Sequence, residues 1–212
     1  MKKIYILLFL IGSFVGCKTT QEITKTDVNE KALNHKAFEK VCVLALMHDT
    51  GMKEKVEKRM VKALKKHDMN VVASADIAPN KLKSLRGVSV QVLDSILNDS
   101  GCDALFTVSL LDTKSESKYI HNDETIGTTA KFSYVYYGDY RSYYSYRNSA
   151  EHQAASVLEQ TSYIIESVMY DVKSSQYVWS VQSDALQPVS IKSWVRGYAK
   201  LIEEKISEIK TN

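Results

Sequence analysis

The chain has 212 residues, a formal net charge of +3 at pH 7 and 44% hydrophobic residues. This nearly balanced charge gives no support for nucleic-acid binding as a main function, because domains that bind phosphate backbones carry a marked basic excess. The length suits one ordinary domain with a core of its own.

The first sixteen residues have the layout of an export signal. Lys2 and Lys3 precede an apolar run from Ile4 to Val15, and the small residue Gly16 follows it. A helix of that run would cover about 18 Å, which is short of the ~30 Å of a membrane's hydrocarbon core. We therefore expect residues 1–16 to be a signal peptide that is removed.

The residue that follows this signal is a cysteine. The run from Phe14 to Cys17 resembles a bacterial lipobox, which implies that Cys17 is acylated and that its fatty chains anchor the protein in a membrane. Lys18 is not the aspartate that retains such proteins in the inner membrane, and no acidic surface-export tag follows. The resemblance therefore implies an outer-membrane lipoprotein that faces the periplasm. Plain secretion stays open as an alternative.

The chain after Cys17 divides into a tether and a domain. Residues 18–36 are polar, and we expect a tether that reaches at most about 65 Å when extended. Residues 37–212 then form a single α/β domain with a tyrosine-rich insertion at about 122–150.

The first half of this domain alternates strands and helices. Continuous apolar runs predict buried strands, and apolar residues at helical spacing predict amphipathic helices. This alternation predicts parallel strands with right-handed helical crossovers. The expected elements are the strand 40–47, the helix 52–67, the strand 70–77, the helix 89–99 and the strand 103–111.

The second half changes character. Residues 162–172 and 176–183 predict an antiparallel hairpin, and residues 189–209 predict an amphipathic C-terminal helix. The expected fold class is therefore α/β, with a β-α-β-α-β parallel core that an antiparallel hairpin extends.

Two cysteines besides Cys17 fall at the beginnings of predicted strands. Export would place Cys42 and Cys102 in an oxidising compartment, where they could form a disulfide if the two strands are neighbours. We favour two buried free thiols, because cysteine is a common core residue.

This pattern resembles a known envelope domain. The resemblance is to the α/β domain shared in outline by periplasmic activators of penicillin-binding proteins, curli-secretion lipoproteins and the N-terminal domain of TolB-type proteins. It implies a protein that binds other proteins or assembles complexes, and it carries over no partner-binding residue. The matching features are the strand 41–47, the helix with Glu57 and Leu64, the strand 71–75, the entry Ser100-Gly101-Cys102-Asp103-Ala104-Leu105 and the later hairpin with Tyr170-Asp171 and Val178-Trp179-Ser180.

The segment 132–146 is dense in tyrosine. Tyrosine combines a large apolar area with a hydrogen-bonding tip, which suits recognition surfaces, and arginine adds a planar donor. We expect a protein- or glycan-binding surface, and the alternatives are an exposed hairpin, a poorly ordered insertion or a pore-forming hairpin. The expected contact residues are Tyr134, Tyr136, Tyr137, Tyr140, Arg141, Tyr143, Tyr144 and Tyr146.

One edge of the predicted sheet carries ionisable residues. His48 and Asp49 end the first strand beside Asp76, at the edge where parallel α/β sheets bind ligands. The simpler interpretation is that Asp49 or Thr50 caps the next helix. Since no catalytic, phosphate-binding or metal-binding motif occurs, we expect no enzyme, no cofactor and no metal.

These observations together predict a non-enzymatic lipoprotein that binds or regulates an envelope protein complex. An oligomeric secretion or assembly component stays open as an alternative. A ligand-binding or hydrolytic enzyme that uses the His48/Asp49/Asp76 edge is a further alternative.

Overall fold

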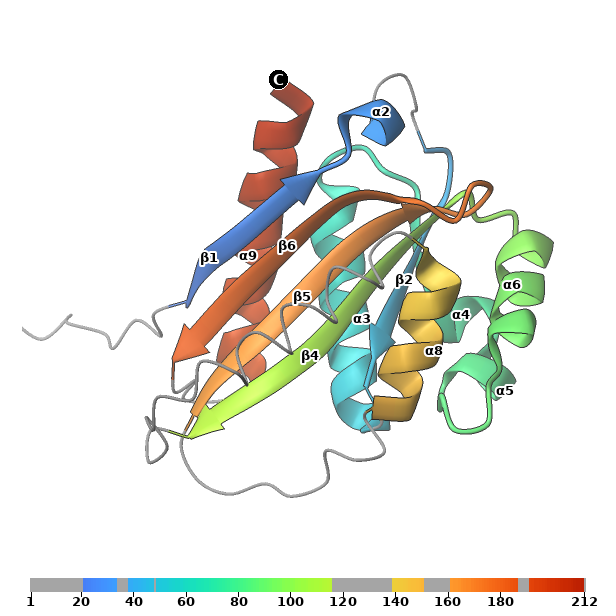
Figure 1. The fold of residues 1–212 in the computed structure, drawn as a ribbon, viewed down its shortest axis with the longest axis horizontal. Coiled ribbons are helices and arrows are strands. Elements are labelled where there is room, and N and C mark those ends of the chain that lie inside the picture. Colours follow the sequence, from blue (N-terminus) through green and yellow to red (C-terminus); the bar gives the residue numbers. More distant parts are fainter. Residues whose placement is uncertain are drawn as a thin grey trace, which may run out of the picture.

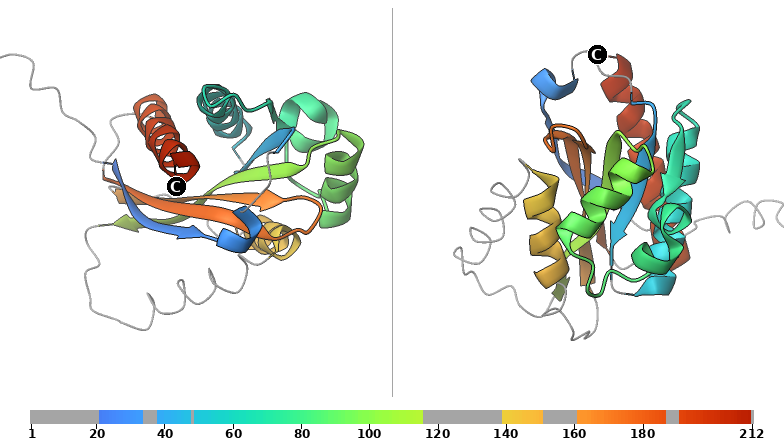
Figure 2. Two further views of the ribbon diagram at one scale, coloured as in Figure 1. Left: turned by 90° about the horizontal axis from the view of Figure 1, so that it is seen from above. Right: turned by 90° about the vertical axis from the view of Figure 1, so that its right-hand side faces the viewer.

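The computed structural model describes residues 21–33, 38–47, 49–115, 139–150, 161–186 and 191–211. In this part of the chain a single sheet is covered by helices on both faces (Figures 1 and 2), which confirms the α/β fold class. In chain order the elements are β1 (Gln21–Val28), α2 (Glu30–Leu33), β2 (Val41–Leu46), α3 (Thr50–Lys65), β3 (Val71–Ala73), α4 (Ser74–Ile77), α5 (Pro79–Leu82), α6 (Val90–Asp99), β4 (Ala104–Ser115), α8 (Tyr140–Ala150), β5 (Thr161–Asp171), β6 (Tyr177–Leu186) and α9 (Ile191–Thr211).

The strands follow the order β1-β6-β5-β4-β2-β3 across the sheet. β2 pairs in parallel with β3 and β4, whereas β4–β5, β5–β6 and β1–β6 are antiparallel. Every residue of β2 is buried, because helices cover both faces of this central strand. The predicted parallel core and its antiparallel hairpin are therefore both confirmed.

Two apolar layers enclose the sheet, because alternate residues of a strand point to opposite faces. Val41 and Val43 of β2 join the layer under α3 and α9, in which Trp179 of β6 and Trp194 of α9 are buried. Cys42 lies with Leu44 in the other layer, which α5, α6 and α8 cover. Figure 2 shows these two groups of helices on opposite sides of the sheet.

The connection between α6 and β4 explains why Gly101 and Asp103 occur in the segment 100–105. Gly101 has φ +67°, a left-handed conformation that glycine adopts without steric cost. The carboxylate of Asp103 then accepts the backbone N–H groups of Glu39 at 2.7 Å and Lys40 at 2.8 Å. This aspartate fixes the start of β2 beside the start of β4.

The beginning of the domain differs from our expectation. Residues 21–33, which we expected within the tether, form β1 and α2, and β1 pairs with β6 along its whole length. Ile23 and Val28 contact the core from an edge strand whose other residues are polar, so little apolar periodicity marks it. Ladder hydrogen bonds to β6, which sequence patterning does not reveal, stabilise this strand.

The second predicted strand, 70–77, is shorter than expected. Only Val71–Ala73 pairs with β2, and the chain then turns into α4 at Ser74.

Among the described residues, none of the helices combines the length and the apolar character that crossing a membrane requires.

Candidate functional site

The tyrosine-rich segment is only partly described. Tyr134, Tyr136 and Tyr137 lie outside the described residues. The remaining expected contact residues belong to helix α8, and they are Tyr140, Arg141, Tyr143, Tyr144 and Tyr146. Because this stretch is helical, the hairpin interpretations are wrong for it.

Three of these tyrosines are buried. Tyr140, Tyr143 and Tyr144 are 1%, 2% and 1% exposed, and their spacing places them on one face of α8. The ring of Tyr140 meets that of Tyr170 in β5 edge-on at 6.1 Å, and the ring of Tyr143 lies 6.0 Å from it. These three rings hold α8 against the sheet, which corrects our expectation that they form a contact surface.

The hydroxyl groups of the three buried tyrosines of α8 all have partners. Tyr144 donates to the carbonyl of Val88 at 3.2 Å, and Tyr143 donates to the Glu166 carboxyl at 2.6 Å. Burial raises the pKa of Tyr144 to about 12, so its hydroxyl stays a donor at neutral pH. The polar tips therefore fix the position of α8 as well as its packing.

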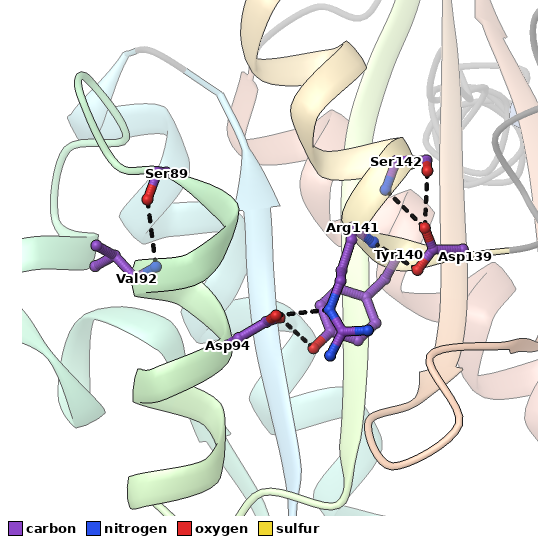
Figure 3. A network of polar contacts seen from close by, with 7 residues as sticks. All are labelled: Ser89, Val92, Asp94, Asp139, Tyr140, Arg141 and Ser142. Atoms are coloured by element: carbon purple, nitrogen blue, oxygen red, sulfur yellow. Dashed lines mark hydrogen bonds and ion pairs between the residues drawn. The ribbon is translucent and has the colours of Figure 1, made fainter.

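The start of α8 is joined to α6 by a polar cluster at the surface (Figure 3). Asp94 of α6 accepts the Tyr140 hydroxyl at 2.5 Å and pairs with the Arg141 Nε at 2.6 Å. Asp139 caps α8 by accepting the backbone N–H of Ser142 at 3.0 Å. The Arg141 side chain is 48% exposed, so it alone among the expected contact residues with described side chains is open to a partner.

The strand edge with His48, Asp49 and Asp76 holds no catalytic cluster among its described residues. Asp49 accepts the backbone N–H of Met52 at 2.6 Å, which makes it the N-cap of α3. Asp76 is exposed in α4, and His48 lies outside the described residues. No group of three or more histidine, cysteine or acidic side chains that could hold a metal ion occurs in the described part of the chain.

A basic hollow opens beside this edge. It has a volume of about 530 Å³ and lies between Thr50 of α3 and the segment from α5 to α6. Lys81, Lys83 and Arg86 line it, all three are exposed, and no carboxylate is among the residues that line it. Sequence patterning did not indicate this hollow, because its three cations lie in a short helix and a loop with no recognisable motif.

A buried polar network lies beneath the same edge. Glu57 accepts hydrogen bonds from Lys53, from the Ser74 hydroxyl at 2.7 Å and from the backbone N–H of Ala45 at 3.0 Å. Because β3 ends at Ala73, it provides no partner for this N–H group, and the Glu57 carboxylate takes its place. The network pairs two buried charges and satisfies a backbone donor, so its role is structural. It is closed to solvent, since Lys53 and Glu57 are each 1% exposed.

Cys42 and Cys102 are free and buried, as we favoured. A hydrogen bond from Cys42 is the main cause that lowers the Cys102 pKa to about 6, and a second comes from Ser100 at 3.2 Å. The same contact and burial raise the pKa of Cys42. Both shifts favour a thiol on Cys42 that donates to the sulfur of Cys102.

The chain is similar to some solved structures, at low sequence identity. No protein-family model matches the chain, and no curated protein matches it. Among solved structures, the chain is similar to a PelC dodecamer from Paraburkholderia phytofirmans, with a TM-score of 0.43, 10% identity and coverage of 88% of this chain and 96% of that one. It is also similar to the lipoprotein GNA1162 from Neisseria meningitidis, with a TM-score of 0.41, 9% identity and coverage of 79% and 96%.

Proposed function

We propose that this protein is a non-enzymatic lipoprotein of the outer membrane whose α/β domain faces the periplasm and binds or regulates an envelope protein complex. The observation that carries the proposal is the export-signal layout that ends at Cys17. Acyl chains on this cysteine would contribute about 0.8 kcal/mol per buried methylene, so more than one chain makes anchoring stable.

The partner surface is proposed around the start of α8. Arg141 is exposed there, next to the ring of Tyr140 at 5.5 Å. Tyr134, Tyr136 and Tyr137 precede α8 in the sequence. The burial of the α8 tyrosines does not bear on these three, so they remain proposed contact residues. Tyrosine and arginine are among the side chains that most often anchor protein interfaces.

The anchor is tested in the native host. Mass spectrometry of the purified protein should find residues 1–16 removed and Cys17 acylated, and Cys17→Ser should release the protein from the membrane fraction. Lys18→Asp is the matched control, because it keeps the lipid site but should move the protein to the inner membrane. An unmodified Cys17 thiol, or an intact leader, would overturn the proposal.

The partner surface is tested by photo-crosslinking. A photoreactive residue in place of Arg141 should yield an adduct with an envelope protein, whereas one in place of Lys62, which is exposed on α3, should yield none. Replacing Tyr134, Tyr136 and Tyr137 by serine should remove the adduct and leave the fold intact. An unchanged adduct in that variant would exclude these tyrosines as contact residues.

A further inference from the structure

The proposed lipid anchor lies very close to the folded domain. β1 begins at Gln21, so only Lys18, Thr19 and Thr20 separate it from Cys17. The four steps from residue 17 to residue 21 span at most about 14 Å. If Cys17 is acylated, as proposed above, the domain lies against the bilayer with the start of β1 nearest to it.

The strand pairing identifies the end of the sheet that faces the bilayer. Gln21 lies opposite Ala185 near the end of β6, and Thr161 at the start of β5 lies opposite Ser115 at the end of β4. β2 runs parallel to β4. The start of β1 therefore lies beside the end of β6, and β2 and β4 run toward this same end of the sheet (Figure 1), although β2 stops level with Lys25.

The basic hollow is at this same end. α3 begins shortly after β2 ends, and its first residue, Thr50, is part of the hollow's lining. Lys81, Lys83 and Arg86 are exposed around it, with no carboxylate in the lining. Lysine and arginine are the side chains that bind phosphate groups, and each cation near an anionic membrane surface strengthens attachment about fivefold.

We infer that this end of the domain lies on the membrane and that the basic hollow receives the phosphate groups of anionic phospholipids. The short connection to Cys17 and the three exposed cations of the hollow, whose lining holds no carboxylate, carry this inference together. It rests on the proposed acylation and assigns a second, protein-mediated contact with the bilayer.

The orientation can be measured with two matched labels. Ser84 at the hollow and Ser174 in the β5–β6 turn are both exposed serines that accept a backbone hydrogen bond of 3.4 Å from the residue two positions on. The acylated full chain carrying Ser84→Cys or Ser174→Cys is labelled with a fluorophore. It is then placed in vesicles of phosphatidylcholine and phosphatidylglycerol that contain a headgroup quencher.

We expect quenching at position 84 to exceed that at position 174 several-fold, because the β5–β6 turn lies at the opposite end of the sheet. Equal quenching at the two positions would overturn the orientation. In vesicles of pure phosphatidylcholine, quenching at position 84 should fall, and an unchanged value would overturn the role of anionic headgroups.

The role of the hollow is tested by charge reversal. Combining Lys81→Glu, Lys83→Glu and Arg86→Glu should lower quenching at position 84 and make it insensitive to phosphatidylglycerol. The control combines Lys62→Glu, Lys65→Glu and Lys173→Glu, which reverses three exposed cations at the opposite end and should change nothing. Equal behaviour of the two variants would exclude the hollow as the binding site.

The outcomes separate this inference from the proposed function. Absence of the acyl group, detected by mass spectrometry, contradicts the proposed function itself. An acylated chain that shows no preferential quenching at position 84 contradicts only the membrane-facing surface.

Discussion

Helix α3 carries two lysine–glutamate pairs with the same i, i+4 spacing, one buried and one exposed. Lys53 and Glu57 are buried in a network with Ser74, whereas Glu54 and Lys58 are paired on the exposed face of α3. A buried charge that loses its partner keeps its desolvation cost, but an exposed one is solvated by water. The fold therefore depends on the first pair and tolerates loss of the second.

Glu57→Ala should lower the free energy of unfolding by about 3–5 kcal/mol, because it leaves the buried Lys53 charge without its counter-ion and the Ala45 N–H without its acceptor. Glu54→Ala is the matched control and should produce a much smaller change. Urea denaturation of both variants measures the difference, and equal midpoints would contradict this account.

The cysteine pair makes stability depend on pH. The Cys102 pKa is about 6 in the folded protein against a usual value of 9.0, so the unfolded chain binds more protons between these values. Stability from this group should therefore rise from pH 6 to pH 9 and be lost as the pH falls through 6. Above pH 9 the raised pKa of Cys42 acts in the opposite direction.

Denaturation of the wild type and of Cys42→Ala across pH 5–9 tests this expectation. Without the hydrogen bond from Cys42, the pKa of Cys102 should move back toward its usual value, and the rise in stability should largely disappear. An identical pH profile for both proteins would show that the two sulfur atoms do not interact.

At the scale of the element, α8 is held by tyrosines that differ in their partners. Tyr143 donates to Glu166, which is fully buried, whereas Tyr144 donates to a backbone carbonyl at a longer distance. Tyr143→Phe should cost about 1–3 kcal/mol of stability, because the Glu166 carboxyl loses a donor in the core. Tyr144→Phe should cost less stability. Thermal melting of both variants measures the two losses, and a larger loss in Tyr144→Phe would contradict this account.

The elements that could be predicted are those with strong periodicity. β2 and α3 follow from their apolar patterns, and the hairpin β5–β6 and helix α9 follow from theirs. The sequence also held a helical signal for α8, because Tyr140, Tyr143 and Tyr144 occupy one helical face. The overall density of tyrosine and serine obscured it, because both residues also suit exposed loops.

Other features could not be predicted because they depend on distant segments. β1 is stabilised by pairing with β6, and its polar residues match those of a tether. The basic hollow requires α5 and the start of α6 to meet the start of α3, a long-range packing that local patterns do not record.

At the scale of the whole molecule, β1 attaches the amino end of the domain to the sheet. Ile23 packs against the core under α9 and lies opposite Ser183 of β6. Ile23→Asp should detach β1, because it places a charge against that core. Hydrogen exchange should then accelerate in β6 and stay slow in β2.

Glu22→Ala is the control for this change, since Glu22 is exposed on the same strand. It should leave exchange in β6 unchanged. Acceleration throughout the sheet in Ile23→Asp would instead mean that β1 is required for the fold as a whole.

The pairing of the first strand with the last also constrains the order of assembly. A chain that passes through a membrane with its amino end leading presents β1 long before its partner emerges. Pairing over such a sequence separation closes slowly, because a long loop must be ordered first. If the protein is exported as proposed, β1 is therefore expected to join the sheet last, after β6 has left the translocation channel.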